Sequence, residues 1–239
     1  MTARNGTASE DPAKHLAILE QAIRSFAELG FRGTDVQVIA DRAGVGKGTV
    51  YRYFRNKEDL FWAATYEVMM RLERHLDAAM IGVEGAAAKL RASSMAYAEF
   101  FEANPPYLEM FVQERAEFRG CGPEPHLEFH EQMMRKFGAI LQQGVEDGEL
   151  RPVDPRTTML ALGCLLHGTV VLGSHVRPAS VMQIAEQAVD VFMRGLRTES
   201  TPTDKTGTGL SRSYCAQTSD LVAARGQSPY CPVSGRETP

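Results

Sequence analysis

The sequence predicts an all-α protein with a helix-turn-helix head and a larger helical body. Apolar residues recur at helical spacing through most of the 239 residues, and no segment alternates convincingly with period two over strand length. Glycine and proline divide this pattern into about nine helices. We expect a disordered N-terminus over residues 1–12, the head over 13–60, the body over 61–198 and a disordered tail over 199–239.

The first two helices of the head are marked by their apolar stripes and their ends. Gly30 is placed to stop the first helix, and Gly44 breaks the second. Thr34 and Gln37 have the spacing of a capping box at the start of the second helix. The expected buried residues are Leu19, Ile23, Phe26 and Ala27 in the first helix and Val36, Ile39, Ala40 and Ala43 in the second.

A third helix is expected over residues 46–54, and Asn56 caps a fourth that reaches about residue 80. Val50 and Phe54 lie one turn apart, so they point toward the core. The outward positions of the third helix are then Lys47, Gly48, Tyr51 and Arg52. The small residue at position 48 allows the helix backbone to approach another surface closely.

The body continues as helices near residues 83–103, 106–119, 125–147, 155–175 and 179–197. Prolines stand where a first helical turn tolerates them, at Pro105, Pro125, Pro155 and Pro178. From residue 199 the composition shifts to Ser, Thr, Gly and Pro with few large apolar residues, which is typical of disorder.

Charge is unevenly distributed along the chain. The net charge is −4, and residues from Phe61 onward include 17 basic and 22 acidic side chains. In contrast, the segment 42–57 contains five basic and no acidic residues, which favours local binding of a polyanion. Four widely spaced cysteines, no secretory leader and no apolar run of about 20 residues lead us to expect a cytoplasmic protein.

The stretch "AGVGKGTVYRYF" over residues 43–54 resembles both a phosphate-binding loop and a helix-turn-helix. A phosphate-binding loop requires glycine at position 41 and a hydroxyl at position 48, but the chain has Asp41 and Gly48. The chain also offers no strands for the parallel sheet that such a loop needs. The helix-turn-helix interpretation fits the neighbouring residues, with its third helix entering a major groove of DNA.

The segment "TDVQVIADRAGVGKGTVYRYFRNKEDLF" is similar to the DNA-binding core of the TetR/AcrR family of transcriptional regulators. The similarity covers residues 13–64 and includes the Ala-Gly-Val turn, Gly-x-x-Tyr-x-Tyr-Phe at 48–54 and Asn-Lys-x-x-Leu at 56–60. The remainder of the chain resembles the family in length and helical pattern. The resemblance implies a cytoplasmic homodimer that binds a palindromic operator and is released by a small molecule.

The resemblance implies nine DNA-binding residues. Lys47, Gly48 and Tyr51 are expected to meet base edges, and Arg52 a base or a phosphate. Anchors to the DNA backbone are expected at Thr49, Tyr53 and Lys57, with a further contact from Thr34 and Gln37. Gln37 has the alternative role of closing the capping box, and Tyr53 that of a core residue.

The body is expected to supply a dimer seam and an effector pocket, both implied by the resemblance. The seam residues are Leu162, Leu166, Val170, Ile184, Ala188 and Val191. The pocket residues are Tyr97, Phe101, Tyr107, Met110, Phe111, Met134, Phe137 and His167. Methionine and aromatic side chains suit a plastic apolar cavity, although such a stripe also forms ordinary core. The effector itself is not identified by the sequence.

No enzyme, cofactor or metal site is predicted. His126 and His130 lie four residues apart on one helix face, a spacing that allows metal binding, but solvent exposure is the commoner explanation. Cys164 is expected to be a buried packing residue. The principal alternative function is a constitutive or architectural helix-turn-helix module without ligand control, and a metal-dependent enzyme ranks below it.

Overall fold

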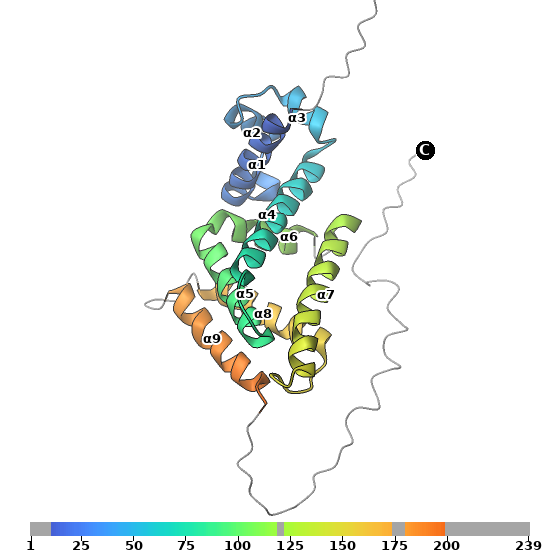
Figure 1. The fold of residues 1–239 in the computed structure, drawn as a ribbon. Helices are drawn as coiled ribbons and strands as arrows, with labels where there is room; N and C mark the ends of the chain where they lie inside the picture. The colour runs from blue at the N-terminus through green and yellow to red at the C-terminus, as the bar shows by residue number, and fades with distance from the viewer. Residues whose placement is uncertain (1–10, 119–121, 174–179, 199–239) are drawn as a thin grey trace, which may run out of the picture. The chain divides into compact units, whose positions relative to one another are not determined.

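The computed structural model describes residues 11–118, 122–173 and 180–198, and these residues form nine α-helices (Figure 1). The helices are α1 (Pro12–Gly33), α2 (Val36–Arg42), α3 (Lys47–Tyr53), α4 (Lys57–Met80), α5 (Ala86–Ala103), α6 (Pro105–Phe118), α7 (Glu124–Glu146), α8 (Pro155–Gly173) and α9 (Val181–Leu196). Within those ranges the only β-pairing is an isolated bridge between Leu150 and Arg197. The predicted all-α class is confirmed.

The predicted terminal segments fall mostly outside the described residues. This is so for the whole tail over 199–239 and for residues 1–10. The expectation of disorder up to residue 12 is wrong for its last two positions, because α1 begins at Pro12. The carboxylate of Asp11 accepts the N–H of Ala13 at 3.0 Å and so caps this helix.

The caps of the head helices fix where each one begins and ends. Gly30 interrupts α1 as predicted, since its φ of 72° breaks the helical backbone before a last turn. Asp35, rather than Thr34, caps α2, because its carboxylate accepts the N–H of Gln37 at 2.8 Å. The predicted cap of α4 is confirmed, since the side chain of Asn56 accepts the N–H of Asp59 at 2.7 Å.

A continuous hydrophobic core joins the head to the body. Helix α4 runs unbroken across the boundary predicted at residue 60, and its buried face continues from Leu60 to Leu76. Aromatic rings from three helices meet around it: Phe31 of α1, Phe61 and Trp62 of α4, and Phe118 of α6. The centroid distances from Phe118 are 5.1 Å to Phe31 and 4.7 Å to Trp62.

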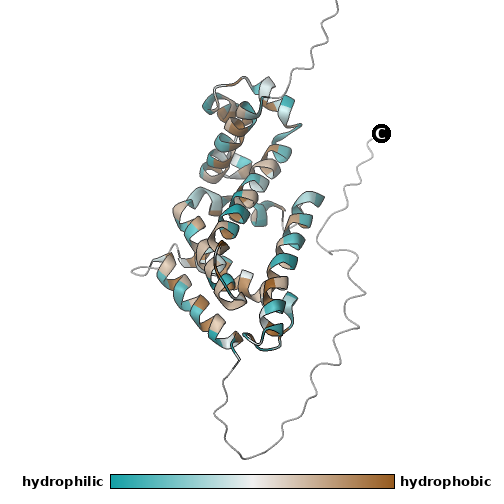
Figure 2. Cartoon of the chain, viewed as in Figure 1, coloured by the Kyte–Doolittle hydropathy of each residue, from teal (hydrophilic) through white to brown (hydrophobic). Residues whose placement is uncertain are grey.

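In the body, α5 packs against α4, α7, α8 and α9. A second cluster of buried side chains fills the space among these helices, with Leu90, Leu141, Leu162 and Val189 at its centre. Most helices are two-toned in hydropathy, with hydrophilic and hydrophobic residues on the same helix (Figure 2). This patterning is what a helix with one face on a core requires.

Helix α8 is the exception to this division. Its 18-residue window has a mean hydropathy of 1.3, so among the described helices it alone is long and apolar enough to cross a membrane by composition. The sequence-based expectation that no apolar run approaches a membrane span overlooks it. One such helix is weak evidence for a membrane span, because helices of globular cores pass the same test. Leu160 and Leu172 of α8 are exposed, so this helix presents an apolar face outside the protomer core.

Substitution of Gly144 tests the packing of α7 against α5 and the segment that follows α7. A Cβ at this position would lie 2.7 Å from the Cβ of Ala86 and 2.7 Å from a methyl group of Leu150. We expect Gly144→Ala to lower the free energy of unfolding by about 1–3 kcal/mol. Gly138→Ala on the same helix meets only an ordinary contact at 3.8 Å, so it should be neutral or stabilise by about 0.5–1 kcal/mol. Urea denaturation measures the free energy of unfolding of both variants. If Gly144→Ala and Gly138→Ala changed it equally, the close packing at Gly144 would be contradicted.

Candidate DNA-binding surface and cavity

Helix α3 presents a continuous outward face. Val50 is buried on its inner side, and Phe54 follows the helix into the same core. Gly48, Tyr51 and Arg52 are exposed on the opposite side, as the sequence predicts. A Cβ built on Gly48 would meet no atom within 4 Å, so the space in front of this turn is open. The surface can therefore approach a groove closely and offers a phenol ring and a guanidinium to it.

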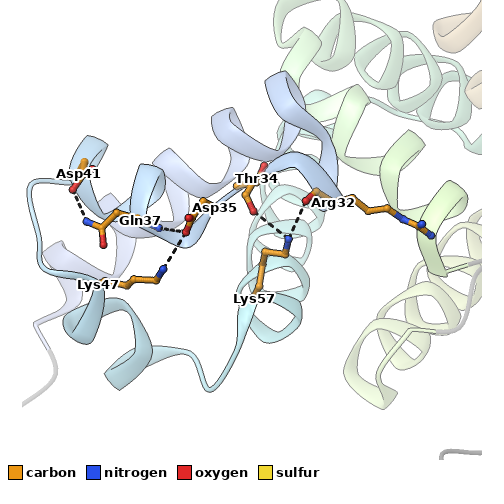
Figure 3. Close-up of polar contacts among 7 residues, drawn as sticks. All are labelled: Arg32, Thr34, Asp35, Gln37, Asp41, Lys47 and Lys57. Atoms are coloured by element: carbon orange, nitrogen blue, oxygen red, sulfur yellow. Dashed lines mark hydrogen bonds and ion pairs between the residues drawn. The ribbon is translucent and has the colours of Figure 1, made fainter.

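Lys47 is paired with the residue that caps α2, Asp35 (Figure 3). Its Nζ lies 3.1 Å from Oδ1 of Asp35, the atom that also accepts the N–H of Gln37. The N–H of Gln37 and then the ammonium group of Lys47 lower the pKa of the Asp35 carboxyl. Because both side chains are exposed, this ion pair stabilises the fold little. Lys47 can exchange Asp35 for a DNA acceptor, while the carboxylate opposes the approach of phosphates.

Gln37 and Thr49 remain proposals as DNA contacts. The side-chain amide of Gln37 donates to Oδ1 of Asp41 at 2.7 Å and stays exposed on α2 (Figure 3). Thr49 is half-buried in the first turn of α3. Neither side chain is committed to the core, so both are available at the edge of the α3 face.

The expectation that the Thr34 side chain contacts DNA is wrong. This side chain is 3% exposed. Its hydroxyl donates to the carbonyl groups of Gly30 at 2.7 Å and Ser25 at 3.0 Å. Thr34 therefore satisfies carbonyl groups at the end of α1, where helix termini lack partners.

Lys57 and Tyr53 also make hydrogen bonds inside the head, and their role as anchors to the DNA backbone stays a prediction. Nζ of Lys57 donates to the carbonyl groups of Thr34 at 3.1 Å and Arg32 at 3.4 Å (Figure 3). It also lies over the ring of Phe31, 4.8 Å from the ring centroid. The hydroxyl of Tyr53 accepts the N–H of Asp11 at 3.0 Å. These bonds hold α4 and α3 to the two ends of α1.

The body contains a cavity of about 430 Å³ that is partly open to solvent. Side chains from five helices line it, α4 to α8, and most of them are apolar. Polar groups stand at one part of the wall: Glu114 and Arg115 of α6, His130 of α7 and His167 of α8. Burial raises the pKa of the Glu114 carboxyl, so the cavity favours its neutral form. The volume falls within the range typical of small-molecule sites.

Two family models match the chain. Residues 18–64 match the model described as bacterial regulatory proteins, tetR family, and residues 83–196 match the model described as tetracyclin repressor-like, C-terminal domain. Together they cover both the helix-turn-helix and the body that contains the cavity. The chain belongs to the TetR family. It is a DNA-binding transcriptional regulator, as the sequence predicts.

Individual relatives and solved structures also support this assignment to the TetR family. It is 27% identical over 146 residues to the uncharacterized HTH-type transcriptional regulator YhgD of Bacillus subtilis, covering 61% of this chain and 76% of that protein. It is 28% identical over 151 residues to the HTH-type transcriptional repressor KstR2 of Mycolicibacterium smegmatis, covering 61% and 72%. The structure of AibR in complex with isovaleryl coenzyme A and operator DNA has the same fold, with a TM-score of 0.63, 20% identity and coverage of 74% and 97%.

Five of the eight predicted pocket residues line the cavity: Tyr97, Phe111, Met134, Phe137 and His167. The prediction is wrong for the other three. Phe101 and Met110 are fully buried in the core beside it, and Tyr107 accepts a hydrogen bond from Arg71 at 2.6 Å. Sequence reasoning missed Glu114, Arg115 and His130, because a charged or polar residue on a helix gives no periodic signal that it faces a cavity.

The predicted dimer seam is only partly available on the surface of this regulator. Leu162 and Leu166 are buried and line the cavity, and Val170 is buried in the core, so these three expectations are corrected. On α9, Val191 is exposed and Ile184 and Ala188 are half-buried. Cys164 is exposed and not a buried packing residue as expected. Leu162 and Cys164 both line the cavity, but Leu162 is buried whereas Cys164 remains accessible to solvent.

The two histidines considered for a metal lie in different environments. His126 is 3% exposed and packs on Trp62 with ring centroids 4.8 Å apart, while His130 is exposed at the cavity wall. Among the described residues, no group of three or more His, Cys, Asp or Glu side chains is arranged to hold a metal ion. Nε2 of His126 is buried and has no hydrogen-bond partner. Burial, and then the charge of His130, lower the pKa of His126 to about 4.

Replacing Asp35 by asparagine should strengthen DNA binding. Asparagine keeps an oxygen for the N–H of Gln37 and so preserves the cap of α2. It removes the charge that holds Lys47 and repels phosphates, so we expect operator affinity to rise severalfold at low salt. Asp41→Asn on the same helix is the control, because Asp41 does not pair with Lys47. Fluorescence anisotropy measures both, and equal gains would show that only net charge matters.

Acid should destabilise the protein through His126. Its folded pKa of about 4 lies below the unfolded value of 6.5, so the unfolded chain binds more protons between these pH values. Stability is therefore full above pH 6.5 and falls as the pH drops toward 4, by at most about 3 kcal/mol. His126→Phe keeps an aromatic ring but cannot bind a proton, so it should make the free energy of unfolding less dependent on pH, by a slope equivalent to at most one proton. Denaturation at pH 7 and pH 5 measures it, and an unchanged pH dependence would contradict the assignment.

Proposed function

We propose that this TetR-family regulator is a homodimeric repressor whose affinity for a palindromic operator falls when a small molecule fills the cavity. Its two α3 helices enter adjacent major grooves about one DNA turn apart. Lys47, Gly48 and Tyr51 meet base edges, and Arg52 contacts a base or a phosphate. Gln37 and Thr49 add contacts at the edge of this face.

The observation that carries the proposal is the position of α6. One face of this helix lines the cavity with Phe111, Glu114 and Arg115. Another face contacts α1: Oε1 of Gln113 accepts the N–H of Phe31 at 3.4 Å, and Glu117 accepts from Nε of Arg32 at 2.8 Å. A ligand that displaces α6 therefore moves the head directly, in addition to any shift of α4.

Helices α8 and α9 form the dimer seam in this proposal. Thr157, Ala161, Cys164, Gly168 and Leu172 share one outward stripe of α8. Small side chains in this stripe allow a second helix to pack closely. Leu172 is 67% exposed and Val191 of α9 is 70% exposed, so only contact with a second protomer would remove these apolar side chains from water. Association of two protomers into a four-helix bundle covers these residues.

Operator recovery tests the proposed function. The protein is incubated with genomic DNA fragments, the retained fragments are sequenced, and the affinity for the recovered site is measured with and without a small-molecule extract of bacterial cells. The proposal requires that the recovered site is palindromic and that the extract releases the protein from it. It also requires that Lys47→Ala weakens binding to that site by about 1–3 kcal/mol but does not weaken binding to random DNA. Retention that no extract reverses would favour a constitutive DNA-binding module instead.

Val191→Glu should separate the protomers. In a monomer the new carboxylate stays in water, whereas in the seam two carboxylates would be buried near the two-fold axis. We expect the dimer dissociation constant to rise by about 100-fold or more and operator affinity to fall with it. Ile81→Glu is the matched control, since Ile81 is 81% exposed and lies after α4, outside the seam. Sedimentation velocity decides, and a stable Val191→Glu dimer would place the seam elsewhere.

A further inference from the structure

The side chains that line the cavity of about 430 Å³ are of two chemical kinds. Most of its wall consists of flexible or aromatic apolar side chains, such as Met69, Phe129, Met133 and Phe137. Since a water molecule occupies about 30 Å³ in the liquid, the space suits a ligand of on the order of 10–15 non-hydrogen atoms. An unbranched or lightly branched hydrocarbon chain fits such a wall, because methionine side chains adapt to its shape.

The polar part of the wall collects basic groups from three helices. Arg115 of α6, His130 of α7 and His167 of α8 all line the cavity. Burial, followed by the charge of Arg115, lowers the pKa of both His130 and His167. The hydroxyl of Tyr97 lies 3.4 Å from Nδ1 of His167 and adds a fourth polar group.

Arg115 has no ion-pair partner among the residues that the structure describes, whereas most other arginines of the body are paired. Its neighbour Glu114 is buried and does not pair with it. Burial raises the pKa of the Glu114 carboxyl, and the charge of Arg115 acts in the opposite direction. The guanidinium of Arg115 is therefore not held in an ion pair by any side chain that the structure describes, and it is available to an anionic ligand.

We propose that the cavity binds a small amphiphile with a single carboxylate, whose anionic head pairs with Arg115 beside His130 and His167 and whose hydrocarbon part fills the apolar wall. This inference names the effector class of the proposed function and rests on it. A guanidinium matches the geometry of a carboxylate through two parallel hydrogen bonds. The two imidazoles and the Tyr97 hydroxyl are further hydrogen-bond partners for its oxygens.

Two other classes of ligand fit less well. An amine of the same length would use Glu114 as its counter-ion but would place its charge beside Arg115. An acyl thioester of coenzyme A, the kind of ligand in the AibR structure, is several times larger than this cavity. Its nucleotide portion would extend beyond this space, whereas the free acid fits within it.

Titration calorimetry of the full-length protein without DNA separates these classes. The probes are decanoate, decylamine, decanol and decanoyl coenzyme A below their micelle concentrations. We expect decanoate to bind about 10- to 100-fold more tightly than decanol, the range that hydrogen bonds to charged groups provide. Tightest binding of decylamine or of the coenzyme A thioester, or equal binding of decanoate and decanol, would overturn the proposal.

Variants assign the head-group site. Arg115→Gln should abolish the preference for decanoate over decanol, and Arg115→Lys should restore part of it. Glu114→Gln should leave the preference intact, and Arg135→Gln is the control for removal of an exposed charge on α7 outside the cavity. Because Arg115 is exposed, these variants should fold, which circular dichroism confirms. A preference for decanoate that survives in Arg115→Gln contradicts the assignment.

Operator binding with decanoate distinguishes this inference from the proposed function. If decanoate binds through Arg115 without changing operator affinity, the ligand class holds and the release mechanism fails. If decanoate does not bind while a cell extract releases the operator, the carboxylate class is wrong and the ligand-responsive repressor stands.

Discussion

The contact of Phe118 with Phe31 and Trp62 is the constraint on which the rest of this structure depends. Each aromatic side chain buries a large apolar area, and together the rings join the end of α6 to α1 and α4. The cavity and the head therefore share one core instead of meeting across a flexible linker. Because a packed core deforms little, a change in the cavity wall must either be absorbed locally or move the head as a body.

Polar contacts around this core engage several of the cations in the basic segment 42–57. Lys57 donates to the carbonyl groups of Arg32 and Thr34, and Lys47 pairs with Asp35. The bonds of Lys57 satisfy carbonyl groups at the end of α1 that would otherwise lack partners. The exposed pair of Lys47 and Asp35 stabilises the fold little, so Lys47 can exchange it for contacts with DNA.

Helix α8 shows how one apolar segment can serve two surfaces. Its inner residues, including Leu162 and Leu166, line the cavity, and its outer residues, including Leu172, remain exposed in the protomer. Apolar composition on all sides explains its similarity to a membrane span. Cys164 belongs to both surfaces, because it lines the cavity and also lies in the proposed seam stripe.

The sequence by itself determined the helices, the turn at Gly44 and the outward face of α3, because capping residues, glycines and apolar periodicity act over a few neighbouring residues. It also determined the family, through motifs within one continuous segment. Only the tertiary structure decided that Thr34 is buried, that Arg115 faces a cavity and that Cys164 is exposed. These facts depend on which helix packs against which face, and side chains distant in the chain make that choice.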